Sequence, residues 1–186
     1  MTSAAMTVPG TATNHQPWAD EIYTLFKAHA IAVVSTVPDA GHSRLLTLCR
    51  EDGAMQLVTL TSEEEGIALA AGAYLGGKRA ALLMQSSGVG NCINLLSLLK
   101  TCRIPMLTLV TMRGEFGEFN PWQTPMGQAT TAVLTAMDVV VQRVDHLAEV
   151  HEVVDAAARL AFDSYCAVAV LLSQRLIGTK RFVEGQ

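Results

Sequence analysis

The sequence predicts an α/β fold, with an open, mainly parallel sheet of about six strands and helices on both of its faces. Short apolar runs rich in β-branched residues alternate with segments whose apolar residues recur at helical spacing. The predicted strands are apolar on both faces, which is typical of parallel strands covered by helices on each side. With 186 residues, the chain has the length of one domain.

The predicted elements begin at Pro17, because proline is favoured in the first turn of a helix. Ile22, Leu25 and Phe26 share helical spacing, which predicts a helix over residues 17–29. The β-branched run over residues 31–37 predicts the first strand. Further strands are expected over residues 55–60, 79–84, 106–112, 139–144 and 167–172. Helices are expected over residues 43–50, 63–76, 91–101 and 147–165, with a long loop over residues 113–127 that leads into a short helix.

Composition limits the classes of function. Half of the residues are apolar and 16% are charged, so the chain is expected to fold around a large core. The net charge of −4 provides no basic surface for nucleic acid. The most continuous apolar stretch, residues 67–77, is about half as long as a membrane span. A high apolar content in so small a chain predicts an interface with a partner chain.

The two ends of the chain are expected to lie outside the domain. Residues 1–16 have neither the basic nor the apolar region of a signal peptide, which predicts a flexible leader on a cytoplasmic protein. Residues 17–175 would form the single domain, and residues 176–186 a C-terminal tail. The four cysteines are widely spaced with no CxxC pair, which favours buried, reduced thiols over zinc ligands or disulfides.

Unusual residues collect in the loops that follow the predicted strands. In an open parallel sheet these loops all lie at one edge, and ligands bind there. The loops in question cover residues 37–39, 61–65, 85–91 and 113–115. The sequence therefore predicts a functional site at the carboxyl edge of the sheet.

Three consecutive glutamates open the helix predicted after residue 62. Ser62 and Glu65 match a capping box, which accounts for both residues structurally. Glu64 is not explained in this way, because it shares a stripe of the helix with Ala68 and Leu75. This helix is apolar nearly all round and is expected to be buried on every side, so the carboxylate would need a specific partner. Glu64 is therefore a candidate functional residue, with a merely structural role as the alternative.

A small polar turn is expected between the strand over residues 79–84 and the helix over residues 91–101. Gly88 and Gly90 would let the backbone approach a ligand closely, and Ser86, Ser87 and Asn91 offer hydrogen bonds, with Asn91 as the helix N-cap. The glycines match a dinucleotide fingerprint only in part, because its third glycine and its acidic residue are missing. An ordinary tight turn is the alternative.

The loop over residues 113–127 carries three aromatic residues, and ordered loops of this length are usually functional or lie at an interface. Arg113 could grip an anionic group with two parallel hydrogen bonds. An ion pair with Glu115 or Glu118 is an equally good interpretation of Arg113. Among the histidines, His42 lies nearest to the predicted site edge.

Taken together, these segments resemble the pyrimidine-binding domain of thiamin diphosphate-dependent decarboxylases. The resemblance is closest to the alpha subunit of sulfopyruvate decarboxylase and the corresponding part of phosphonopyruvate decarboxylase. It extends from about Ile22 to Leu172. Its most specific parts are EEEGIALAAGAYLGGK (residues 63–78) and MQSSGVGNCINLL (residues 84–96), together with the WQTPMG loop (residues 122–127) and the VPD turn (residues 37–39).

The resemblance implies roles for particular residues. Glu64 would hydrogen-bond N1′ of the cofactor's aminopyrimidine and so activate the cofactor. The cofactor pocket would include Glu64, Gln85, Ser86, Ser87, Gly88 and Asn91. The substrate, a small anionic 2-oxo acid such as sulfopyruvate or phosphonopyruvate, would meet Asp39, His42, Arg113 and Gln123. Ala40 stands where relatives often have serine, so a hydroxyl that contacts the substrate is expected to be absent.

The resemblance also implies a partner. Relatives bind the diphosphate through a metal held by a Gly-Asp-Gly motif, and this sequence contains no such motif. A separate beta subunit would then hold Mg²⁺ and the diphosphate, in an α2β2 or larger assembly. Two other classes stay open at this point, a regulatory module that binds a nucleotide or anion and a non-catalytic subunit of an α/β complex.

Overall fold

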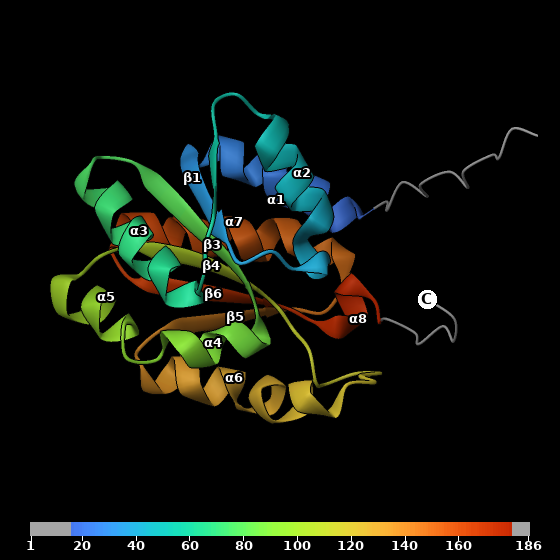
Figure 1. Ribbon diagram of the computed structural model, residues 1–186. Helices are drawn as coiled ribbons and strands as arrows, with labels where there is room; N and C mark the ends of the chain where they lie inside the picture. Colours follow the sequence, from blue (N-terminus) through green and yellow to red (C-terminus); the bar gives the residue numbers. More distant parts are fainter. Residues whose placement is uncertain (1–15, 180–186) are drawn as a thin grey trace, which may run out of the picture.

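The computed structural model describes residues 16–179 (Figure 1), so nearly all of the expected leader and most of the expected C-terminal tail lie outside the described residues. The strands are β1 (Ile31–Thr36), β2 (Gln56–Thr59), β3 (Arg79–Gln85), β4 (Met106–Thr111), β5 (Val140–Val144) and β6 (Ala167–Leu172). The helices are α1 (Pro17–Ala28), α2 (Ser43–Glu51), α3 (Glu63–Leu75), α4 (Ser86–Cys92), α5 (Leu96–Cys102), α6 (Thr124–Ala136), α7 (Val150–Ser164) and α8 (Gln174–Ile177). Short 3-10 turns cover Ala40–His42, Pro121–Gln123 and Leu147–Glu149.

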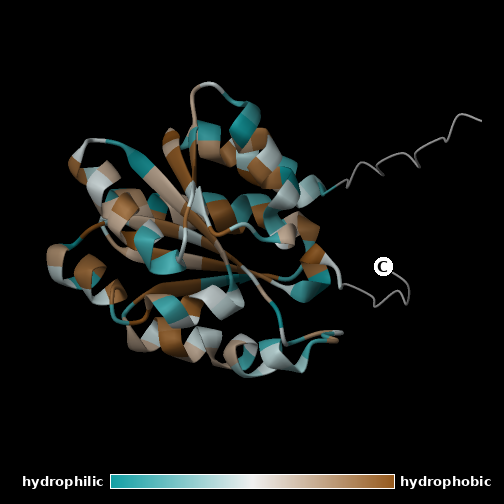
Figure 2. Ribbon diagram, viewed as in Figure 1, coloured by the Kyte–Doolittle hydropathy of each residue, from teal (hydrophilic) through white to brown (hydrophobic). Residues whose placement is uncertain are grey.

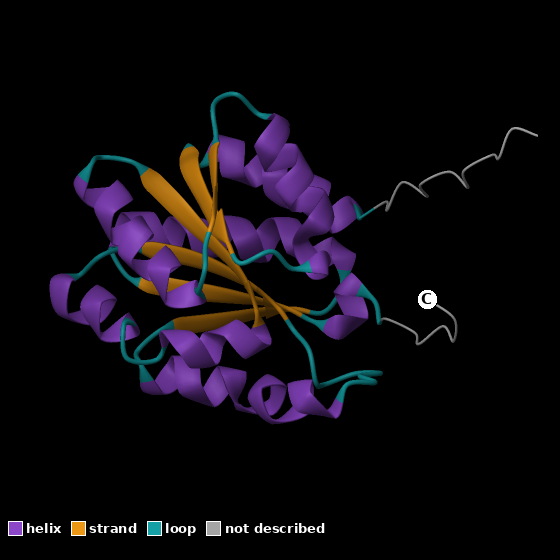
Figure 3. Cartoon of the chain, in the orientation of Figure 1, coloured by secondary structure: helices purple, strands orange, loops and turns teal. Residues whose placement is uncertain are grey.

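The six strands form one parallel sheet in the order β2-β1-β3-β4-β6-β5, which confirms the predicted fold class. Helices α1, α2 and α7 pack on one face of the sheet, and α3, α4, α5 and α6 pack on the other (Figures 1 and 3). The strands therefore lie between two layers of helices. Figure 2 shows the sheet mostly in the tan and brown of hydrophobic residues.

The two faces of β3 show why its sequence is apolar between Arg79 and Gln85. Ala81 and Leu83 join the core beneath α1, α2 and α7, whereas Leu82 and Met84 join the core beneath the other layer. Successive side chains of a strand point to opposite faces, so a strand buried on both sides needs an apolar residue at every position. β4 and β6 are likewise buried at every residue.

The prediction of a polar turn after β3 is wrong. Helix α4 begins at Ser86, immediately after Gln85, and ends at Cys92. A break over residues 93–95 then separates it from α5, so the helix expected over residues 91–101 is shorter and starts later. Asn91 lies inside α4 and does not cap it. Gly88 and Gly90 are helical residues that let neighbouring side chains pack closely on α4.

The long loop predicted to extend to Gly127 is also shorter than expected. A 3-10 turn begins at Pro121 and leads directly into α6, which contains Gly127. A Cβ at Gly127 would lie 2.9 Å from the carbonyl carbon of Arg113 and closer still to its oxygen. Glycine at this position thus allows α6 to pack against the chain just after β4. Helix α8, which no pattern indicated, straddles the expected domain boundary at residue 175.

The strand order places a topological switch point between the carboxyl ends of β1 and β3. After β1 the chain turns to the face covered by α2, and after β3 it turns to the face covered by α4. Adjacent strands whose connections leave to opposite faces open a gap at the edge of the sheet, and ligands of open α/β sheets bind in such gaps. This switch point lies at the edge that the sequence predicts for the site.

Within residues 16–179, no helix is long and apolar enough to cross a membrane. All four cysteines are free, with Cys49 and Cys92 buried as expected. Cys102 is exposed, which corrects the expectation that every thiol is buried.

Candidate active site

The carboxylate of Glu64 lies at the start of α3 and is half-buried. The hydroxyl of Ser62 donates a hydrogen bond to Glu64 Oε2. This bond, with a backbone N–H at the helix start, lowers the pKa of Glu64, so the carboxylate is ionised at neutral pH. None of the ion pairs among the described residues includes Glu64.

The predicted capping box between Ser62 and Glu65 does not form. Ser62 has the extended backbone of an N-cap, but its side chain makes no cap hydrogen bond because its hydroxyl is bound to Glu64. Glu65 Oε2 instead accepts a hydrogen bond from the backbone N–H of Thr61, at 2.8 Å. The sequence pattern located the start of the helix correctly but assigned the wrong partners.

Glu63 contacts α4 on the other side of this helix start. Its Oε2 accepts a hydrogen bond from Asn91 Nδ2 at 2.8 Å. A Cβ at Gly88 would lie 2.6 Å from Cγ of Glu63 and closer to its carboxylate, so the side chain of Glu63 fills the space that glycine leaves. A carboxylate beside Gly88 would repel a phosphate, which weakens the nucleotide-binding alternative.

Helix α3 is buried on one side only. Gly66, Ile67, Ala70 and Ala71 pack against the sheet, as expected. Ala68 and Gly72 are exposed, as is 80% of Leu75, so the expectation of burial on every side is wrong for the single chain. Because α3 is apolar on both sides, the single chain leaves a stripe of small and apolar residues in contact with water.

Asp39 connects the ends of three strands at this switch point. Its Oδ1 accepts a hydrogen bond from Gln85 Nε2 at 3.1 Å, and its Oδ2 accepts one from Thr111 Oγ1 at 2.7 Å. Ser87 Oγ donates to Gln85 Oε1 at 2.8 Å, which fixes both ends of the Gln85 amide. These bonds connect the turn after β1 with the last residues of β3 and β4 and the first turn of α4.

Burial would raise the pKa of Asp39, but several contacts outweigh it. The hydrogen bond from Thr111, the neighbouring His42, the N–H of Gly41 and the hydrogen bond from Gln85 all lower it. The net direction is downward, so Asp39 is ionised at neutral pH.

His42 lies beneath this cluster and is fully buried. Neither ring nitrogen has a hydrogen-bond partner among the described residues, and Nδ1 is 3.9 Å from Asp39 Oδ2. Burial lowers the pKa of His42 to about 4, against the opposing charge of Asp39, so the ring is neutral. Sequence reasoning placed His42 near the site edge but could not show that its ring points into the core, edge-on to Trp18.

Arg113 is paired with Glu118, which was the alternative interpretation of this residue. Its Nε and one terminal nitrogen each lie 2.6 Å from a carboxylate oxygen, and both side chains are largely buried. Glu118 also accepts hydrogen bonds from Gly114 N, Asn120 N and Gln174 Nε2. Gln174 Oε1 in turn accepts from the backbone N–H groups of residues 115 and 116. Gln174 had no signal in the sequence, because its importance comes only from its position after β6.

A cavity of about 280 Å³ opens beside this cluster. Its walls come from the chain before α1, the turn after β1, Arg113 and the segment around α8: Gln16, Asp39, Ala40, Gly41, Arg113, Gln174, Ile177, Gly178 and Thr179. Glu64 does not line this cavity. The predicted site residues therefore form two groups, one around Glu64 and one around Asp39, with α4 running between them.

Two further predicted residues lie near these groups. The hydroxyl of Ser86 is buried and accepts a hydrogen bond from the N–H of Arg113 at 3.1 Å. Gln123 lies in the 3-10 turn before α6, and its buried Oε1 has no hydrogen-bond partner among the described residues. The adjacent Trp122 is 83% exposed.

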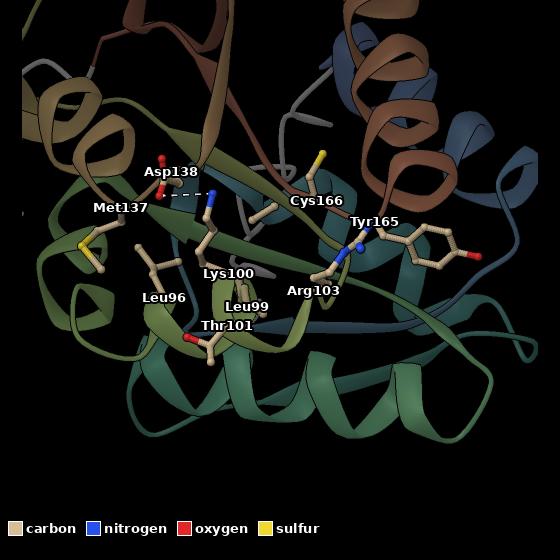
Figure 4. A pocket seen from close by; sticks show the side chains of 10 residues that line it. Leu96, Leu99, Lys100, Thr101, Arg103, Met137, Asp138, Tyr165 and Cys166 are labelled. Carbon is tan, nitrogen blue, oxygen red and sulfur yellow. Dashed lines mark ion pairs between the residues drawn. The ribbon is translucent and has the colours of Figure 1, made fainter.

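Another cavity, of about 450 Å³, lies at the opposite edge of the sheet (Figure 4). Figure 4 shows Lys100 pointing toward Asp138, and the two groups form an ion pair of 3.4 Å. No residue of the predicted site lines this cavity.

Comparison with known proteins supports the fold. The model of the thiamine pyrophosphate enzyme, N-terminal TPP binding domain, matches residues 18–118, which contain both groups of site residues except Gln123 and Gln174. The chain belongs to this family.

Several named proteins are similar to the chain in sequence. Sulfopyruvate decarboxylase subunit alpha of Methanococcus maripaludis is 35% identical over 83% of this chain and 93% of its own. The same subunit of Methanothermobacter thermautotrophicus is 36% identical over 83% and 94%. Phosphonopyruvate decarboxylase of Streptomyces viridochromogenes is 38% identical, but over 59% of this chain and 28% of its own.

A solved structure shares the fold. The chain superposes on 2-oxoglutarate:ferredoxin oxidoreductase of Magnetococcus marinus with a TM-score of 0.67, covering 86% of this chain and 29% of that one. At 15% identity, this likeness supports the fold alone.

Proposed function

We propose that this chain is the alpha subunit of a thiamin diphosphate-dependent 2-oxo acid decarboxylase. The observation that carries the proposal is the state of Glu64: an ionised carboxylate, partly open to the surface, with Ser62 as its side-chain partner and no ion-pair partner among the described residues. Family membership and the similarity to sulfopyruvate decarboxylase alpha subunits support the same assignment.

The residues present fit the cofactor's aminopyrimidine. Glu64 offers a charged acceptor that could hold a proton at N1′ of that ring. On the substrate side, Gln123 offers a buried amide oxygen that has no hydrogen-bond partner among the described residues. Bound thiamin diphosphate would supply the electron sink for the departure of carbon dioxide.

This chain's own residues would orient the reacting groups. The hydroxyl of Ser62 fixes the carboxylate of Glu64, and the start of α4 lies between Glu64 and Asp39. We assign Gln85, Ser86, Ser87, Gly88 and Asn91 to the wall of the cofactor pocket, on the strength of their place on α4 and at the end of β3. Asp39 and Gln123 are assigned to the substrate side.

The substrate proposal is a 2-oxo acid with a second anionic group, such as sulfopyruvate or phosphonopyruvate. Positive charge is needed to bind it, but Arg113 is already neutralised by Glu118 and His42 is neutral and buried. Arg113 and His42 therefore stay predictions as substrate ligands. We assign most of the positive charge to the partner subunit.

The exposed stripe of α3 supports a partner at this site. Ala68, Gly72 and Leu75 follow Glu64 along the same helix and are exposed in the single chain. A beta subunit packed on this stripe would bury the apolar surface and enclose Glu64. We propose that this subunit holds Mg²⁺ and the diphosphate, in an α2β2 or larger complex in the cytoplasm.

The test is coexpression with a chain that carries Gly-Asp-Gly and a downstream asparagine. Carbon dioxide release would be measured for several 2-oxo acids, with thiamin diphosphate and magnesium supplied. The Glu64→Gln complex should assemble normally but release carbon dioxide at least about a hundredfold more slowly. Glu65→Gln is the matched control, since glutamine still accepts the hydrogen bond from Thr61. A Glu64→Gln complex with wild-type turnover would refute the proposal.

A further inference from the structure

The three glutamates at the start of α3 make three different contacts. Glu64 faces Ser62, Glu65 binds the backbone of Thr61, and Glu63 reaches across to α4. We propose that Glu63 is a positioning residue, which holds the start of α3 against α4 through Asn91 and Gly88 and thereby sets the place of the Glu64 carboxylate. The inference rests on the proposed function of Glu64.

The contact between Glu63 and α4 is specific in geometry. The carboxylate accepts from Asn91 Nδ2 at 2.8 Å, and the rest of the side chain lies along Gly88. Any Cβ at residue 88 would displace this side chain. The Glu63 side chain therefore fits here only because residue 88 is glycine. The next residue of α3 is Glu64, so a shift of Glu63 moves Glu64 with it.

Cys92 is a second indication that α3 and α4 are held together near Glu63. Its thiol, on the last turn of α4, has a pKa raised to about 12, chiefly by burial and then by the charges of Glu63 and Glu64. Both carboxylates therefore lie near one buried point of α4, although only Glu63 is hydrogen-bonded to that helix.

The chemistry of Asn91 also suits a positioning role. Asparagine donates a hydrogen bond without bringing a positive charge. A lysine or arginine at residue 91 would hold Glu63 more strongly, but it could also pair with Glu64 one residue away. A neutral donor therefore secures the helix while leaving the Glu64 carboxylate available.

The experiment uses the assembled complex and measures its affinity for thiamin diphosphate at saturating magnesium, with turnover and thermal unfolding recorded for each variant. Glu63→Ala and Asn91→Ala should each weaken cofactor binding about five- to tenfold, as expected for one solvent-exposed hydrogen bond. The double variant should be no weaker than either single one, because both remove the same bridge. Glu63→Gln should stay within about twofold of wild type, since its amide oxygen still accepts from Asn91.

Glu65→Ala is the matched control, because it removes a hydrogen bond at the same helix start without touching α4. It should change cofactor affinity less than about twofold even where it lowers thermal stability. Wild-type affinity in Glu63→Ala, additive losses in the double variant, or an equal loss in Glu65→Ala would each overturn the positioning role alone. A wild-type complex that binds no thiamin diphosphate would overturn the proposed function as well.

Discussion

Arg113 and Glu118 form a two-point ion pair in which both nitrogen–oxygen distances are 2.6 Å. The pair closes the segment after β4 on itself, and only 14% of the arginine side chain and 6% of the glutamate side chain are exposed. Because Glu118 also accepts two backbone N–H groups and the amide of Gln174, one carboxylate organises the whole segment beside the candidate site.

Replacing Glu118 with alanine should therefore destabilise the chain by about 3 kcal/mol, because a largely buried arginine and three other donors lose their acceptor. Urea unfolding of the single chain would measure this. The control is Lys100→Met at the exposed ion pair with Asp138, which should change stability by less than about 1 kcal/mol. Similar effects of the two substitutions would contradict the prediction.

The carboxylate of Glu118 should also make the stability of the chain depend on pH. The hydrogen bonds from Arg113, aided by the backbone donors, lower the pKa of Glu118 from 4.5 to about 2. A lowered pKa means that its stabilisation is complete above about pH 4.5 and is lost as the pH falls toward about 2. Wild type should thus lose more stability than Glu118→Ala over that window, as followed by urea unfolding at each pH.

His42 should affect the stability of the chain in a different pH range. The folded state holds the imidazole neutral down to a pKa of about 4, whereas the unfolded chain takes up a proton near pH 6.5. Stability should therefore fall as the pH drops from about 6.5 to about 4, by up to about 1.4 kcal/mol per pH unit. His42→Phe, which keeps a ring beside Trp18, should show a shallower slope; parallel slopes for variant and wild type would rule this out.

Replacing either of two glycines of α3 with alanine should change the stability of the single chain, in opposite directions for the two positions. A Cβ at Gly66 would lie 2.9 Å from Leu60 Cδ1 and closer to the fully buried Leu82, so Gly66→Ala should cost about 1–2 kcal/mol. A Cβ at Gly72 would meet nothing within 4 Å, so Gly72→Ala should stabilise the single chain by up to about 1 kcal/mol through helix propensity. Thermal unfolding of the two variants would measure both changes. If both variants were stabilised, or both destabilised, α3 would not pack on the sheet as described.

The exposed stripe of α3 should be needed for assembly. Ala68→Arg should leave the single chain as stable as wild type, because this position is exposed, but weaken association with the beta subunit at least about tenfold. Ala132→Arg, at an exposed position of α6, is the matched control and should assemble normally. Copurification and size-exclusion chromatography would compare them, and normal assembly of Ala68→Arg would place the interface elsewhere.

Several features were predictable because they depend on local patterns. The apolar runs located all six strands, and Pro17 located the start of α1. The glutamate run located the start of α3. The polar segment after β3 was misjudged, because glycines at residues 88 and 90 indicate a turn locally, whereas in the fold they admit the side chains of Glu63 and Met126.

The sequence by itself determined the parallel α/β architecture, the edge where we expect the site and Glu64 as its candidate acid, since periodicity and short motifs are properties of neighbouring residues. Only the tertiary structure decided which polar groups meet. It joined Asp39 to Gln85 and Thr111, joined Gln174 to Glu118 and turned His42 into the core. These contacts connect residues from different strands and loops, and their partners are fixed by the order in which the strands pack, which no local pattern encodes.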